Sequence, residues 1–513
     1  MGRGRLTIYE YGTIICDFMK VILAGFNVDL NALKEYKKKN VILTPESISA
    51  AYARISRSPE SVDRLRQESR KEVAKSRRSN RAIIFEMGHH SVAEHAVFNF
   101  DIIGISRIAI EELEKFRLCS YTEKSQRYVT LKGDFVIPED LAKSNLINGY
   151  CNMIKVQNDY YKYLFKKISV RNLSRFSGKV LSKKHAKTLQ NLAKEDARYI
   201  LAMATQTQVG ATINARNLEL MIRRFASNNL KEINELGQKL YALIHKIAPS
   251  IILFHKANDY DQKTYPGLQE HVRNLEVKKI RGSEQKRITD VELVDHTPDG
   301  DTKILAALLF RATNQSYKQA LKRVRKMSKK QKTAFFKKAC CNMELYDVAL
   351  REFEYAHLTY SLIVSAGCFG QLKRHRLASI TSQNYEPALG FTIPGSVIDV
   401  GEERKFIDII KKSEKVHEMI EKKYPHLAAY ILTNAHRKRV LLRVNLRELY
   451  HISRLREDPT AQWDIRDKVI KMSALAREVM PITASLLGGK SDYPKIYKAL
   501  YGKKPKITEV PPL

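Results

Sequence analysis

Apolar and polar residues alternate with two different periods along the chain, and each period predicts one type of element. Residues 96–102, "AVFNFDI", alternate apolar with polar side chains, which is typical of a strand with one buried face. Residues 106–117 and 230–249 instead place apolar residues at helical spacing, and Pro249 ends the second of these helices. The patterns therefore predict a mixed α and β structure.

A strongly basic stretch also has helical spacing. Residues 320–338, "ALKRVRKMSKKQKTAFFKK", are predicted to form one basic helix. We interpret its charges as a solvated helix face, and an anionic partner is the alternative that remains open.

The order of patterns occurs twice along the chain. Four matched segments return in the same order, at offsets between 231 and 270 residues. The matched segments start at Val21 and Val291, Lys115 and Arg374, Ala197 and Ala428, and Ile213 and Val444. Because this period is far too long for a solenoid, we predict a tandem duplication of a domain of about 230–260 residues. The polar stretch 265–290 is the predicted junction, with copy 1 spanning 1–275 and copy 2 spanning 285–513.

Composition limits the class of protein. A chain of 513 residues is too long for one ordinary core, and its net charge of +35 implies anionic partners, with nucleic acid among the candidates. The six cysteines show no CxxC pair and no metal-ligand spacing, so we expect free thiols and no metal site. Glu10 and Asp17 interrupt the apolar N-terminal run, and no apolar run is long enough for a membrane span. We expect a cytoplasmic protein.

Several motifs carry a family resemblance. Copy 1 contains "GHHSVAEH", then "KFRLCSYTEKSQRY", then "INAR", and copy 2 contains "RHRLAS", "VNLREL" and "AQWDIR". In this order and spacing the chain resembles the flavin-dependent thymidylate synthases, and the resemblance covers most of both copies. It implies an α+β fold, with two tandem copies of an α/β domain that has an antiparallel sheet and flanking helices.

The resemblance also implies an activity. In that family FAD and dUMP bind at subunit interfaces of a homotetramer, so a duplicated chain is expected to form a homodimer that acts as a pseudo-tetramer. Methylene-tetrahydrofolate supplies the carbon, reduced flavin supplies the hydride, and NADPH is the expected electron donor. An arginine activates the uracil ring, with no cysteine nucleophile.

Copy 1 matches only part of the family's residue set. The resemblance assigns FAD binding to His89, Ser91, Asn214 and Arg216, and dUMP binding to Glu123, Ser125, Arg127 and Arg198. However, the R-H-R triplet is replaced by Lys115, Phe116 and Arg117, and the glutamine ahead of it by Glu112. The uracil-activating arginine falls on Phe225.

Copy 2 matches the complementary part. The resemblance assigns dUMP binding to Gln371 and Arg374, FAD binding to Arg374, His375, Arg376, Asn445, Arg447 and His451, and catalysis to Arg456. The nucleotide-binding trio is replaced by Ser382, Asn384 and Glu386, and the phosphate-binding arginine by Ala429. A carboxylate such as that of Glu386 repels phosphate.

Because the losses are complementary, we expect one composite active site formed by the two copies, within a chain or between two chains, while the reciprocal site is inactive. Alternative roles stay open: Asn214 and Asn445 are suitable helix N-caps, and Arg127 alone is suitable for a surface ion pair. Alternative functions are the methylation of another pyrimidine nucleotide or of uridine in RNA, and non-catalytic binding of a nucleotide or nucleic acid.

Overall fold

The computed structural model describes residues 19–36, 41–175, 182–275 and 289–508. The chain divides into two compact units. Unit 1 contains residues 1–281 together with 399–432, and unit 2 contains residues 282–398 together with 433–513. Of the predicted junction 265–290, residues 276–288 lie outside the described residues, whereas residues 265–274 form the end of a helix that begins at Asp259. Cys16 and the N-terminal run also lie outside the described residues.

Unit 1 is built on a four-stranded antiparallel sheet with the strand order β1-β2-β4-β3. The strands are β1 (Lys20–Phe26), β2 (Val97–Ser106), β3 (Ser120–Glu123) and β4 (Gln206–Asn214). Strand β2 confirms the predicted alternation, because Phe98, Phe100 and Ile102 are buried while Asn99 and Asp101 are exposed.

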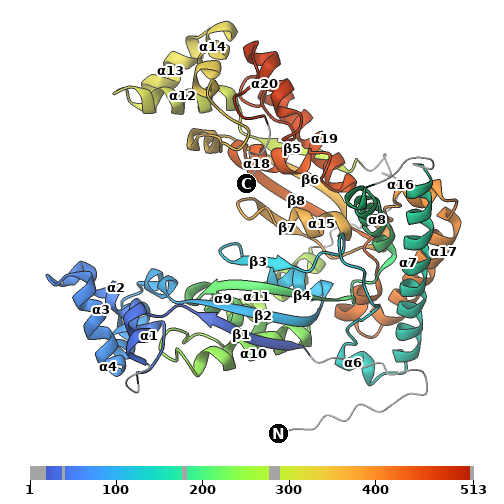
Figure 1. Cartoon of the computed structure of the whole chain (residues 1–513), viewed down its shortest axis with the longest axis horizontal. Coiled ribbons are helices and arrows are strands. Elements are labelled where there is room, and N and C mark those ends of the chain that lie inside the picture. The colour runs from blue at the N-terminus through green and yellow to red at the C-terminus, as the bar shows by residue number, and fades with distance from the viewer. Residues whose placement is uncertain (1–18, 37–40, 176–181, 276–288, 509–513) are drawn as a thin grey trace. The chain divides into compact units, whose positions relative to one another are not determined.

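Unit 2 contains a sheet of the same design, with the order β5-β6-β8-β7. Its strands are β5 (Val291–His296), β6 (His357–Ser365), β7 (Ser379–Ser382) and β8 (Arg437–Asn445). The registers also correspond, since Val97 lies opposite Asn214 in unit 1 and His357 lies opposite Asn445 in unit 2. The shared order confirms the predicted duplication and the α+β fold with antiparallel sheets (Figure 1).

Helices flank the sheet of unit 1. They are α1 (Leu30–Tyr36), α2 (Glu46–Arg54), α3 (Val62–Lys71), α4 (Val73–Arg81), α5 (Arg107–Leu113), α6 (Glu139–Ala142), α7 (Ile147–Ser174), α8 (Lys183–Ala197), α9 (Ala215–Ala226), α10 (Lys231–His245), α11 (Asp259–Asn274) and α17 (Glu403–Glu421). Helix α10 confirms the helix predicted over 230–249, although it ends at His245 rather than at Pro249. The helix predicted over 106–117 is shorter than expected, because α5 ends at Leu113 and a turn follows it.

Unit 2 has its own helices. They are α12 (Gly300–Ala312), α13 (Tyr317–Lys326), α14 (Lys329–Cys340), α15 (Ala366–Leu372), α16 (Gly395–Asp399), α18 (Leu446–Arg456), α19 (Trp463–Val479) and α20 (Tyr493–Tyr501). The prediction of a single basic helix over 320–338 is wrong. Helix α13 ends at Lys326, and Met327 has an extended backbone. Ser328 then caps α14 with a capping box: its side chain accepts from the Gln331 backbone N–H, and the Gln331 side chain accepts from the Ser328 backbone N–H.

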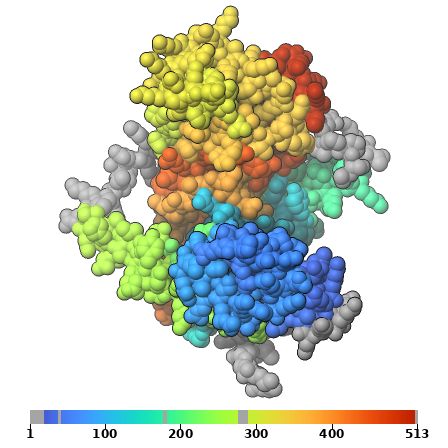
Figure 2. All heavy atoms as spheres, turned by 90° about the vertical axis from the view of Figure 1, so that its left-hand side faces the viewer, coloured from blue at the N-terminus to red at the C-terminus, as the bar shows by residue number. Residues whose placement is uncertain are grey.

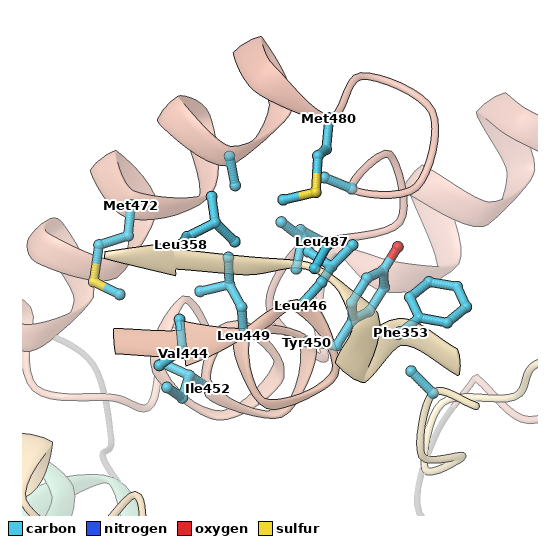
Figure 3. Packing of buried hydrophobic residues seen from close by; sticks show 14 of the residues in the cluster. Phe353, Leu358, Val444, Leu446, Leu449, Tyr450, Ile452, Met472, Met480 and Leu487 are labelled. Atoms are coloured by element: carbon cyan, nitrogen blue, oxygen red, sulfur yellow. The ribbon is translucent and has the colours of Figure 1, made fainter. Parts of the chain in front are cut away.

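The core of unit 2 lies between its sheet and the helices α18 and α19. Leu358 of β6, Val444 of β8 and Met472 of α19 are fully or almost fully buried in one cluster. Figure 3 shows these side chains pointing toward one another, with Tyr450 of α18 beside Phe353. This packing fixes the positions of β6, β8 and α18, the elements that carry or flank the candidate site residues of copy 2.

A segment from copy 2 completes unit 1. Residues 399–432 belong to that unit, where α17 packs against α7. The Gln157 side chain donates hydrogen bonds to Ser413 Oγ at 2.8 Å and to the Ile431 carbonyl at 3.0 Å. The backbone N–H groups of Met203 and Ala204 donate to carbonyls of Leu432 and Tyr430. The compact units are therefore not identical to the two stretches of repeated sequence.

Candidate nucleotide and flavin site

The dUMP-binding residues expected in copy 1 come together at the end of β3. Glu123 is the last residue of that strand and is buried. Arg107, the first residue of α5, donates from Nη1 to Glu123 Oε1 at 2.7 Å, and Thr207 Oγ1 lies 3.4 Å from the same oxygen. Sequence reasoning missed Arg107. Aligning the two copies could have found it, because Arg107 follows the capping Ser106 at the position where Ala366 follows the capping Ser365. An arginine present only in the copy that keeps the other phosphate-binding arginines is a candidate for the same site.

The two arginines expected to hold phosphate both contact Glu195, one through its carboxylate and the other through its backbone carbonyl. Arg127 forms an ion pair with Glu195 of α8, while its backbone N–H donates to Ser125 Oγ at 3.2 Å. Arg198 follows α8 and donates from Nε to the Glu195 carbonyl at 3.2 Å. Glu195, which sequence reasoning also missed, therefore positions both guanidinium groups.

The pKa of Arg198 in this cluster is lower than is usual for an arginine. Burial lowers the pKa of the Arg198 guanidinium, and the positive charges of Arg107 and Arg127 lower it further, while Tyr199 and Glu195 oppose the shift. Three arginines thus act on one another in a site that is mostly shielded from water. Glu123 and Glu195 pair with two of these arginines, so the cluster keeps an excess of one positive charge, which favours an anionic ligand with several oxygens, such as a phosphate.

The FAD residues expected in copy 1 lie around the 3-10 helix His90–His95. His89 and Ser91 are exposed at its start, and His89 Nε2 lies 3.4 Å from Arg57. Arg216 forms an ion pair with Glu94 in this helix. Asn214 is the N-cap of α9 and accepts a hydrogen bond from the Asn217 N–H, so the capping role holds for this residue.

In copy 2 the R-H-R triplet occupies the turn between α15 and β7. Arg374 and Arg376 are exposed, whereas His375 between them is 3% exposed. The Arg374 Nε donates to the Gly370 carbonyl at 3.2 Å, and the buried Gln371 lies 3.4 Å from Gln462 Oε1. The turn therefore separates the triplet, with two arginines directed outward and the histidine inward.

The buried His375 is joined to the expected catalytic arginine. Arg456 Nε donates to His375 Nε2 at 2.9 Å, which leaves the ring proton on Nδ1. That nitrogen lies 3.8 Å from Oε1 of Glu448, which is itself buried. Burial, together with the charge of Arg456 and the nearby His451, lowers the pKa of His375 well below its usual range, so the ring is neutral. Burial raises the pKa of Glu448 to about 7. Sequence reasoning did not single out Glu448.

The same two places in copy 1 hold phenylalanines. Phe116 and His375 each stand ten residues after the capping serine of the preceding helix, and Phe225 and Arg456 each stand eleven residues after the capping asparagine. Phe116 and Phe225 pack edge to face, with ring centroids 5.7 Å apart. A polar pair in copy 2 is thus replaced by an aromatic pair in copy 1, and the two positions differ together.

The remaining FAD residues expected in copy 2 also lie on or beside α18. Asn445 caps this helix by accepting from the Glu448 N–H, and Arg447 donates to Glu354 Oε1 at 2.8 Å. This ion pair corresponds to that between Arg216 and Glu94 in copy 1. In each copy it joins the helix after the last long strand to the short 3-10 helix that precedes the second strand. His451 is exposed, with its ring centroid 6.0 Å from that of His375.

The residues that replace the phosphate set in copy 2 differ from it in charge and in contacts. Ser382 stands at the end of β7 where Glu123 ends β3. Glu386 accepts from the Ala388 N–H at 3.1 Å, so its carboxylate begins a short helical turn. The positions of Arg107 and Arg198 hold Ala366 and Ala429.

The described residues contain no group of three or more His, Cys, Asp or Glu side chains that could hold a metal ion. None of the helices in that part of the chain is long and apolar enough to cross a bilayer. The five cysteines found there form no disulfide.

The duplicated antiparallel α+β domain defines the class of fold, and sequence comparison adds the family. Residues 40–250 and 292–482 each match the thymidylate synthase complementing protein family, and together they make up more than half of the chain. The chain belongs to this family and contains its domain twice.

Individual relatives fall into two groups. A UPF0159 protein of Chlamydia muridarum is 25% identical over 79% of this chain and 80% of its own length, and UPF0159 protein Ta1429 of Thermoplasma acidophilum is 24% identical over 81% and 89%. A flavin-dependent thymidylate synthase of Clostridium tetani is 27% identical over 46% of this chain and 92% of its own length. The first group is similar to both copies in one alignment, and the second to about one copy.

Among solved structures, thymidylate synthase X from Helicobacter pylori, determined with FAD and dUMP, covers 48% of this chain and 100% of its own. Its sequence identity is 20% and its TM-score is 0.28. A UMP/dUMP methylase from Streptomyces cacaoi covers 45% of this chain and 92% of its own, at 16% identity and a TM-score of 0.32.

Proposed function

We propose that this protein is an FAD-dependent enzyme that methylates dUMP at uracil C5, and that its nucleotide site takes the phosphate-binding residues from copy 1 and the uracil-activating arginine from copy 2. The observation that carries the proposal is the matched pattern of retained and lost residues. Copy 1 keeps the arginine cluster around Glu195 but has Phe116 packed on Phe225. Copy 2 keeps His375 bonded to Arg456 but has Glu386 at the position of Arg127 and Ala429 at the position of Arg198.

The residues of both copies are suitable for an anionic cofactor. Arg374 and Arg376 are exposed on one turn, and two guanidinium groups there can hold the pyrophosphate of FAD. The exposed His89 and Ser91 can donate to its polar edges. When FAD is bound and reduced, it supplies the hydride of the reaction.

Each protein residue then has a defined task. Arg127 and Arg198 hold the phosphate of dUMP, while Glu195 keeps both guanidinium groups in place. Arg456 stabilises the negative charge that develops on the uracil ring, and His375 holds that arginine through its Nε2. In the overall reaction the methylene carbon bonds to C5 in place of the C5 proton, its bonds to the folate nitrogens break so that tetrahydrofolate leaves, and the hydride completes the methyl group.

The contribution of Arg456 can be measured. A pre-positioned donor that stabilises developing charge is worth about 3–4 kcal/mol of barrier, so Arg456→Ala should lower turnover about a hundredfold or more. Phe225→Leu, a change at the matched position of copy 1 that keeps an apolar side chain in the core, should leave turnover within about threefold. The assay is dUMP-dependent oxidation of the reduced flavin with methylene-tetrahydrofolate. A protein that binds no FAD, or equal loss in both variants, would contradict the proposal.

A mixing experiment tests which chains share the composite site. Arg127→Ala removes the copy 1 contribution and Arg456→Ala removes that of copy 2. If each site forms within one chain, co-refolded mixtures of the two inactive variants stay inactive. If each site uses two chains, a mixed dimer contains one intact site and recovers activity. Recovery is thus the result expected for sharing between chains. Normal activity in either variant alone would refute a composite site.

A further inference from the structure

The helical layer between β5 and β6 carries a concentration of positive charge. Residues 302–343 contain twelve Lys and Arg but no Asp or Glu, whereas the whole chain has 90 basic and 55 acidic residues. Helices α13 and α14 carry five of these cations each. The overall basic composition does not account for a stretch without any acidic residue, so this layer differs from the rest of the chain.

These charges stand on a rigid base. Ala320 and Val324 of α13 and Phe336 and Cys340 of α14 are buried in the core of unit 2. Capping boxes fix the first turns of both helices. The basic side chains are consequently held on the outer face of a folded layer, and Figure 2 shows this part of the chain, in yellow, as one continuous surface.

The cations of α13 and α14 are not neutralised by the protein. Within the described residues, none of the ten forms an ion pair with a carboxylate. The corresponding layer of copy 1, between β1 and β2, differs in this respect. There Arg66 and Arg70 both pair with the buried Asp29, and Arg77 pairs with the buried Glu46. Unpaired like charges on one surface repel each other, and a bound polyanion removes that repulsion.

Exposed aromatic rings lie next to the basic layer. Phe310 at the end of α12 and Tyr355 before β6 are 48% and 57% exposed. Both contact Tyr317, the first residue of α13, with ring centroids 6.4 and 6.1 Å away. Tyr317 belongs to α13, the helix that also carries five of the cations, so the rings and these cations lie on neighbouring parts of one folded layer. We call Phe310, Tyr317, Tyr355 and the cations of α13 the aromatic–basic surface.

We propose that the aromatic–basic surface of unit 2 binds single-stranded nucleic acid. Proteins that bind single strands combine positive charge along the backbone path with aromatic rings on which bases stack, and both features are present here. A membrane surface is a poorer match, because an interfacial helix exposes its apolar face to lipid, whereas Ala320, Val324 and Phe336 are buried in the core. This inference is independent of the proposed enzyme activity.

The test uses the full chain and a fluorescein-labelled single-stranded oligonucleotide of about 20 nucleotides, with binding followed by anisotropy at several salt concentrations. The charge variant replaces four α13 cations by glutamine: Lys322, Arg323, Arg325 and Lys326. We expect its dissociation constant to rise at least tenfold. The slope of log K against log salt should become shallower by about two to three, since each lost single-strand phosphate contact removes about 0.7.

The matched control removes four cations from another exposed helix. Lys411, Lys412 and Lys415 of α17, with Lys422 just beyond it, are exposed, and replacing them by glutamine changes the net charge equally. We expect this control to bind like the wild type. Equal weakening in both variants would show that binding follows net charge alone, and it would overturn the proposal.

A second variant tests the stacking component. Phe310→Ala combined with Tyr355→Ala should weaken binding about tenfold while leaving the salt slope unchanged, because stacking releases no counterions. Binding to vesicles rich in anionic lipid in place of the oligonucleotide would also overturn the proposal. None of these residues belongs to the proposed dUMP or FAD set, so the flavin oxidation assay should be unchanged in all variants. The two proposals can therefore fail separately.

Discussion

Replacing the His375–Arg456 pair of copy 2 by the phenylalanines that occupy the same places in copy 1 tests whether the two residues act as a unit. Arg456→Phe leaves the acceptor His375 Nε2 buried and without its 2.9 Å donor, which costs about 1–3 kcal/mol. His375→Phe removes the neutral acceptor from a charged guanidinium, which costs about 1.5–3 kcal/mol. Each single change should therefore destabilise unit 2.

The double change should be less harmful than the sum of the single changes. It removes donor and acceptor together, and two rings packed as in Phe116–Phe225 contribute about 0.5–1.5 kcal/mol beyond burial. We expect a coupling free energy of about 2 kcal/mol between the positions. Activity, in contrast, should be lost in all three variants, because each disrupts the arginine that acts on uracil.

The assay is urea denaturation followed by tryptophan fluorescence. Trp463, the only tryptophan of the chain, begins α19 in unit 2, so its signal reports that unit. Phe225→Leu in unit 1 is the control and should not move the Trp463 transition. If the effects of the two single changes add to within about 0.5 kcal/mol in the double variant, the pair is not coupled and the reasoning is refuted.

Three further predictions follow from buried carboxylates and from the phosphate set. Burial raises the pKa of Glu448 from 4.5 to about 7, so its contribution to the stability of unit 2 is full below pH 4.5 and is lost as the pH rises through 7. Glu448→Gln should remove about 2–3 kcal/mol of this pH-dependent loss in the free energy of unfolding, measured from Trp463 fluorescence. A pH profile like that of the wild type would contradict the role of Glu448. Arg127→Ala should lower turnover about a hundredfold while Glu386→Ala leaves it within about twofold, and equal losses would show that the active phosphate set is misassigned. Glu402, which accepts from Tyr163 at 2.7 Å and pairs with Lys167, joins α17 to α7. Glu402→Ala should destabilise this contact by about 2–4 kcal/mol, seen as faster amide exchange in α17, whereas unchanged exchange would count against its role.

Much of the fold could be predicted from the sequence because the signals are local. Alternation at period two defined the buried face of β2, and helical spacing defined α10. The duplication was also visible, because two copies keep the same order of local patterns even where individual residues have changed. The same comparison separated the retained residues of each copy, such as Arg127 and Arg456, without any knowledge of their contacts.

Helix ends were less predictable. The basic stretch continues with helical spacing through Met327, yet the capping box of Ser328 ends one helix and begins another. Likewise, the pattern after Ser106 continues to Arg117, but α5 ends at Leu113. In both cases backbone hydrogen bonding at a few residues outweighs a periodic pattern.

Tertiary structure alone decided which distant residues meet. The sequence by itself determined the fold class, the duplication and the complementary residue sets. Only the folded chain places Arg107 on Glu123, Arg127 and Arg198 at Glu195, and His375 between Arg456 and Glu448. Only the folded chain shows that residues 399–432 of copy 2 complete unit 1. The physical reason is that periodicity shows which face of a single helix or strand is buried. The partner of a charged side chain or of an exposed helix face depends instead on how segments far apart in the sequence pack together.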